Sequence, residues 1–110
     1  MYNLVEKERT ALETDAEGSI IVEYAIITHP LAIEEGISLE CFGIRVSTST
    51  KTGQLIDVAQ IPNITMSALE IRRIFMLLLK HTVTPVSLYE IMDVYLAQPE
   101  HFAHLAEEPV

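Results

Sequence analysis

Apolar side chains in the first half of the chain recur in the patterns of β-strands. Residues 19–28 are rich in β-branched residues and apolar at both sets of alternating positions, which predicts a central strand covered on both sides. We expect this strand to end before His29 and Pro30, because proline cannot donate a backbone hydrogen bond to a central ladder. Residues 30–36 are then expected to form a long, acidic connection.

Two more strands are predicted on either side of a turn. Residues 38–49 form the first, and their apolar positions change phase, which indicates a β-bulge near residues 41–43. Residues 50–53, Thr-Lys-Thr-Gly, are typical of a hairpin turn in which the glycine adopts positive φ. Residues 55–61 return antiparallel to the strand before them, and Pro62 ends them.

The first residues alternate more weakly between apolar and polar side chains. Residues 4–14 fit a strand that pairs with residues 19–28 through a turn at residues 15–18. The pattern also allows one helical stripe, made of Leu4, Val5, Arg9 and Leu12. We favour the strand and expect residues 1–17 to be a peripheral strand or a frayed end.

Two helices are predicted after Pro62, each from a capping box. Ser67 with Glu70, and Ser87 with Glu90, have the spacing at which serine and glutamate satisfy each other's free backbone donors. The first helix is expected to run to about His81, which would cap it, and the second from residue 88 to about residue 98. The apolar stripes expected to face the sheet are Ala68, Ile71, Ile74, Phe75 and Leu78, then Leu88, Ile91, Met92 and Tyr95.

Strands followed by helices predict an α+β fold. The expected architecture is an antiparallel three- to four-stranded β-meander, followed by a two-helix hairpin packed on one face. The 110 residues match the length of one domain, so we expect a single domain over residues 1–110. Residues 99–110 are expected to be a tail or a short capping helix.

The charge of the chain restricts its partners. It has 16 acidic against 7 basic side chains, a net charge of −9. Lysine and arginine must neutralise phosphates for nucleic-acid binding, so this charge disfavours nucleic acid and anionic membranes as partners. Cys41 is the single cysteine, and the chain shows neither a signal-like start nor an apolar run near 20 residues. We therefore expect a cytoplasmic protein.

The order of these signals resembles a known family. The resemblance rests on five features in order: Gly43-Ile44 in a strand, the turn at Gly53, a strand ending near Ile61, a helix, and then Thr-Pro-Val-Ser-Leu-Tyr-Glu-Ile-Met-Asp at residues 84–93. It is to a small domain-of-unknown-function family found mainly in clostridia-like Firmicutes, and it covers about residues 19–98. The resemblance implies a cytoplasmic bacterial protein of similar fold, and it carries over no catalytic residue.

Candidate chemistry is sparse along the chain. His101 and His104 have the spacing of two metal ligands on one helical face, but a polar tail is the favoured interpretation. Cys41 has no activating neighbour in sequence, and we expect a small apolar residue there rather than a reactive thiol. The hydroxyl cluster of residues 47–50 lacks the glycine elbow of a serine hydrolase and fits a strand end. We therefore expect no catalytic residue and no cofactor.

The first predicted helix has more apolar surface than one sheet can cover. Residues 74–79 are apolar all round the helix, so either the second helix or a second subunit must cover the remainder. The same helix contains two adjacent arginines, which either pair with nearby acids such as Glu70 or Asp93 or bind an anion or an acidic partner. The residues expected at an interface are Leu69, Arg72, Arg73, Met76, Leu77 and Leu79.

These patterns favour a non-enzymatic protein-interaction or regulatory module that forms a homodimer through its helices. A further protein partner is compatible with the same surface. The alternative is a small-ligand or metal-binding protein, or an enzyme that uses histidine and acidic residues. DNA binding by the helical pair is disfavoured by the charge.

Overall fold

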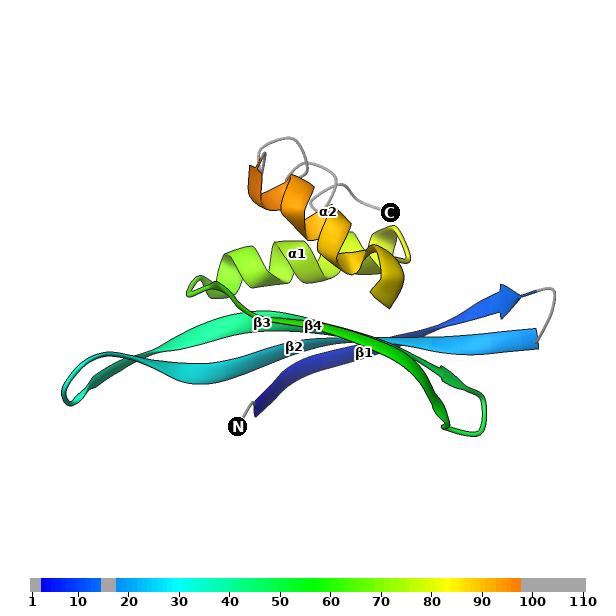
Figure 1. Ribbon diagram of the computed structural model, residues 1–110, viewed down its shortest axis with the longest axis horizontal. Coiled ribbons are helices and arrows are strands. Elements are labelled where there is room, and N and C mark those ends of the chain that lie inside the picture. Colours follow the sequence, from blue (N-terminus) through cyan, green and yellow to red (C-terminus); the bar gives the residue numbers. More distant parts are fainter. Residues whose placement is uncertain (1–2, 15–17, 98–110) are drawn as a thin grey trace.

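A computed structural model describes residues 3–14 and 18–97 of the chain. One four-stranded antiparallel sheet carries two helices on one face, and its strands lie in the order β1-β2-β3-β4 (Figure 1). The α+β fold with a β-meander followed by two helices is therefore confirmed. The elements are β1 (Asn3–Thr14), β2 (Gly18–Glu34), β3 (Ile37–Thr50), β4 (Leu55–Thr65), α1 (Ala68–Lys80) and α2 (Pro85–Ala97).

Strand β2 is longer than its sequence predicted. It continues through Pro30, which pairs with Glu40 of β3, and the expected long connection is instead a tight turn at Glu35 and Gly36. The prediction that proline would end the strand was wrong because the described part of β1 begins opposite Thr28. Beyond that point β2 has a free edge, where a missing N–H breaks no ladder. Gly36 supplies the positive φ of 78° that the turn requires.

The bulge predicted near residues 41–43 belongs to the opposite strand. Phe42 pairs with Thr65 and Ile44 with Ile61, so one residue of β3 faces three residues of β4. The β2–β3 ladder stays regular across the same positions. The apparent change of phase in β3 arises because its two faces are apolar in different parts of the strand. The bulge also lets β4 continue past Pro62 to Thr65, where the sequence predicted an end.

Helix α1 begins at the predicted cap. The Ser67 hydroxyl accepts a hydrogen bond from the Glu70 backbone N–H at 3.1 Å, and His81 is the C-cap residue. The buried side is shifted from the predicted stripe: Ala68 is exposed, and Leu77 is 2% exposed and joins the core. Leu77 belongs to the same buried cluster as residues of the sheet and of α2, so α1 buries more than the single stripe that was predicted.

Helix α2 begins three residues earlier than predicted. Pro85 is its first residue, so Ser87 lies inside the first turn, where its N–H donates to the Thr84 carbonyl at 3.1 Å. Proline suits this position because its fixed φ is helical and its missing N–H has no partner there. The expected capping box at Ser87 was therefore wrong, whereas the predicted inner residues Leu88, Met92 and Tyr95 are buried.

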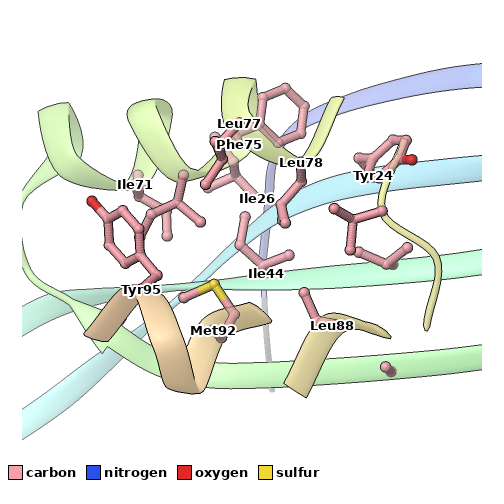
Figure 2. Close-up of a cluster of buried hydrophobic side chains, with 14 of the residues drawn as sticks. Tyr24, Ile26, Ile44, Ile71, Phe75, Leu77, Leu78, Leu88, Met92 and Tyr95 are labelled. Atoms are coloured by element: carbon pink, nitrogen blue, oxygen red, sulfur yellow. The ribbon is translucent and has the colours of Figure 1, made fainter. Parts of the chain in front are cut away.

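The core lies between the helices and one face of the sheet. Figure 2 shows Ile26 and Ile44 of the sheet facing Phe75 and Leu78 of α1 and Met92 of α2. Each of these side chains is almost completely buried. Burial of apolar side chains stabilises the fold by about 1.5–3 kcal/mol each, so this layer is the main source of stability.

Tyr24 is the exception within this apolar layer. Its side chain is 0% exposed, and its hydroxyl has no hydrogen-bond partner among the described residues. Burial raises the pKa of the Tyr24 hydroxyl to about 12, because a phenolate would be poorly solvated there. Figure 2 shows this hydroxyl at one end of the buried cluster.

Candidate functional site

The face of the sheet away from the helices has no cover among the described residues. Val22, Tyr24 and Ile26 point into the core, so alternation places Ala25 and Ile27 on the other side, which we call the open face. The pairing registers carry this side across all four strands. Its large exposed apolar residues include Leu4, Leu31, Ile37, Leu39, Leu55 and Val58.

Three residues at the centre of the open face are buried even though no helix covers them. Ala25, Ile27 and Cys41 belong to this side, and Ile27 is 1% exposed. Figure 1 shows that the β2–β3 hairpin at the left and the β3–β4 hairpin at the right both bend away from the helices, so the sheet is curved. Nearby, the side chains of His29 and Asn63 are hydrogen-bonded across β2 and β4. Cys41 is thus a buried apolar residue, as its sequence context predicted.

The middle of the open face carries more cations than anions. The Glu23 carboxylate accepts a hydrogen bond from Arg9 Nε at 2.6 Å and lies 3.9 Å from Lys7 Nζ. Arg45 Nε donates to Gln60 Oε1 at 2.7 Å, which extends the polar band to β4. This face therefore differs in charge from the chain as a whole, whose net charge is −9.

A shallow depression of about 270 Å³ lies at the β3–β4 turn end of the open face. Arg9 and Lys51 provide positive charge at its rim, and Glu23 provides one carboxylate. Its remaining lining is hydroxyl and apolar: Ser47, Ser49, Thr50, Ile21 and Leu55, with Gly53 at the turn. The hydroxyl cluster is thus a strand end, as predicted, and it also lines this depression. The arrangement suits a carboxylate or another small anion.

The residues predicted at a helical interface are divided by the structure. Leu69, at 65% exposed, and Met76 lie on the surface of α1, whereas Leu77 is buried and Leu79 packs partly against the core. A surface interface therefore cannot include Leu77.

The two arginines of α1 lie near acidic residues of the same chain. Arg72 Nη1 donates to Glu6 Oε1 of β1 at 2.7 Å, which is a more distant acid than the sequence suggested. Burial raises the pKa of the Tyr95 phenol and the nearby Glu70 carboxylate raises it further, while the positive charge of Arg73 lowers it by less.

His101 and His104, the metal-ligand candidates, lie outside the described residues. Within residues 3–14 and 18–97, no three histidine, cysteine, aspartate or glutamate side chains gather where they could hold a metal ion. Over the same residues, no helix combines the length and the apolar character needed to cross a membrane.

Sequence reasoning missed the hairpin that β2 and β3 form at residues 30–40. A signal for it was present: apolar Leu31, Ile33, Ile37 and Leu39 alternate symmetrically about Glu35 and Gly36. Pro30 concealed this signal because it was taken as the end of a central strand.

Comparison with known proteins agrees with the resemblance but adds no activity. No curated protein and no solved structure matches the chain. One family model, described as "Family of unknown function (DUF6514)", matches residues 1–98. This match spans all four strands and both helices. The chain therefore belongs to the DUF6514 family.

Proposed function

We propose that this protein is a non-enzymatic, cytoplasmic protein-interaction or regulatory module that acts as a homodimer. The observation that supports it best is the open face of the sheet, where six large apolar side chains are exposed around a buried apolar centre. Large apolar side chains exposed on one face of a protein mark interaction sites.

The open face is a better dimer surface than the helix layer. The helix layer also exposes apolar side chains, but Leu77, expected at a helical interface, is enclosed, and Arg72 is engaged by Glu6 within the same chain. The exposed residues of that layer include Leu69 and Met76 of α1 and Val86, Val94 and Leu96 of α2. The open face instead extends across four strands, and it combines exposed apolar residues with the cations of its middle. A second copy can cover this face without breaking any contact within the first copy.

The experiment compares two leucines of nearly equal exposure. Leu55 on the open face is 61% exposed and Leu69 on α1 is 65% exposed. Sedimentation velocity at micromolar concentrations should show a dimer for the wild type and for Leu69→Gln, and a larger monomer fraction for Leu55→Gln. The opposite ranking moves the interface to the helices. A wild type that stays monomeric overturns the proposal.

A second candidate function is the binding of a small anion, favoured by the depression that Arg9 and Lys51 border. Guanidinium and ammonium groups beside three hydroxyls form a suitable site for a carboxylate or phosphate. A thermal-shift titration with inorganic phosphate and with citrate tests it. We expect each anion to raise the Tm of the wild type and to leave unchanged the Tm of a variant with Arg9→Gln and Lys51→Gln. A wild-type Tm that does not change with either anion contradicts the proposed anion site.

A further inference from the structure

The β2–β3 hairpin extends beyond the rest of the sheet. Within the described residues, β1 begins opposite Thr28 and β4 ends opposite Phe42, so residues 30–40 pair only with one another. We call these residues the arm. Figure 1 shows the arm at the left end of the sheet, away from both helices. Every residue of the arm is exposed.

The arm is apolar and acidic at the same time. Leu31 pairs with Leu39 across its two strands, and Ile33 and Ile37 flank its turn. Its charged residues are all glutamates, Glu34, Glu35 and Glu40, and it contains neither lysine nor arginine. An isolated two-stranded hairpin is marginally stable in water, so a hairpin of this composition gains most by packing against another surface.

The depression has the complementary composition. Arg9 and Lys51 supply positive charge, and Ile21 and Leu55 supply apolar walls. Arg9 already bonds Glu23, yet its exposed guanidinium has further donors that can bind a second carboxylate. A chain with a net charge of −9 repels its own copies, so a region where unlike charges meet favours a specific approach.

The two regions lie at opposite ends of the same face. The arm contains the first residues of β3, and the depression is lined by residues near its other end, Ser47, Ser49 and Thr50. Figure 1 shows the arm and the β3–β4 turn at the two ends of the sheet. A two-fold axis that runs parallel to the open face and perpendicular to the strands, placed midway between the two regions, turns two open faces towards each other and brings each arm to the depression of the other copy. Such an exchange is closed and occurs twice, as in other two-fold dimers.

We infer that the arm of each copy docks in the depression of a second copy of this chain. This inference rests on the proposed homodimer and names the segment that fills each site. Glu34 and Glu35 meet Arg9 and Lys51, while the leucines and isoleucines of the arm cover the apolar walls. Salt should weaken the dimer because it screens the charges at the rim of each contact.

A charge-exchange experiment tests the inference. One variant carries Glu34→Lys and Glu35→Lys in the arm, and the other carries Arg9→Glu and Lys51→Glu in the depression. Alone, each places like charges at both contacts, so the dimer dissociation constant should rise about tenfold or more. Mixed in equal amounts, they restore opposite charges at both contacts and should form a heterodimer of near wild-type affinity. Sedimentation velocity measures the dissociation constants of the two variants and of their mixture.

Controls separate this inference from the proposed function. A control variant with Glu90→Lys and Asp93→Lys on α2 changes the net charge by the same amount as the arm variant. It should form the dimer as tightly as the wild type does. Restoration on mixing also shows that both variants are folded, and circular dichroism checks each alone. A wild-type dimer that persists in both variants overturns the arm contact but keeps the homodimer. Variants that lose the dimer and do not recover it on mixing also overturn the arm contact. A monomeric wild type overturns both proposals.

Discussion

Gly43 of β3 and Pro62 of β4 pass so close that a Cβ on Gly43 would lie 2.4 Å from the Pro62 carbonyl oxygen. The Ile61 carbonyl oxygen would be equally near, at 2.3 Å. Both obstacles are backbone atoms, which cannot rotate away as a side chain can. The β4 bulge therefore depends on the absence of a side chain at residue 43.

Gly43→Ala should lower the free energy of unfolding by about 3 kcal/mol, because β4 must move away from β3. Urea denaturation measures the change. Gly36→Ala is a suitable control, since a Cβ there meets nothing within 4 Å and only the positive φ of 78° opposes it. That control should cost about 1 kcal/mol. Equal losses in the two variants would contradict the close approach.

Tyr24→Phe should raise the free energy of unfolding by about 1 kcal/mol, because it removes a buried hydroxyl that has no partner. Tyr89→Phe provides a matched control of opposite sign. The Tyr89 hydroxyl accepts from the Gln60 N–H at 3.2 Å and donates to its carbonyl at 3.3 Å. Its loss should lower the same free energy by about 1 kcal/mol. Urea denaturation at neutral pH gives both values.

The stability of the wild type should fall between pH 10 and pH 12. Burial raises the pKa of Tyr24 from 10.0 to about 12, so the folded state holds a proton that the unfolded state releases. This contribution is complete below pH 10 and is lost as the pH rises towards 12. Tyr24→Phe lacks this group and should lose less stability over the same interval. Parallel curves for the two proteins would contradict the prediction.

The two serines of the predicted capping boxes should respond differently to alanine. Ser67→Ala removes the acceptor for the Glu70 N–H and should lower the free energy of unfolding by about 1 kcal/mol. Ser87 follows the true start of α2 by two residues and caps nothing there. Its alanine variant should stay within about 0.5 kcal/mol of the wild type. Thermal unfolding of the two variants compares their losses of stability.

Much of the fold could be predicted because local chemistry determines it. The Thr50–Gly53 turn, the Ser67 cap and the inner residues of α2 each depend on neighbours within a few positions. The errors at Pro30, Pro62 and Pro85 share one cause: the effect of a proline depends on what lies beside it. Pro30 and Pro62 lie in strands because each has a free edge or a bulge there, and Pro85 begins a helix. The residues next to Pro30 and Pro62 in the sequence do not show which strands lie beside them in the sheet.

The candidate site was harder to predict than the fold. The surplus of apolar side chains was visible in the sequence, but its position was expected on α1, and the sheet has a second exposed apolar face. Arg9 and Lys51 are 42 positions apart along the chain, and only strand pairing brings them to one depression. Composition alone could not show that this acidic chain gathers cations on one side.

The meander order has a consequence for how the chain folds during synthesis. Each strand pairs with its neighbour in sequence, so the sheet can form one hairpin at a time as the chain leaves the ribosome, without closing a long loop. Both helices follow the entire sheet. Until they emerge, Val22, Ile26 and Ile44 are as uncovered as the opposite side, and the nascent sheet is apolar on both surfaces. Release of a chain truncated before α2 therefore exposes an aggregation-prone sheet that only a chaperone or another chain can shield.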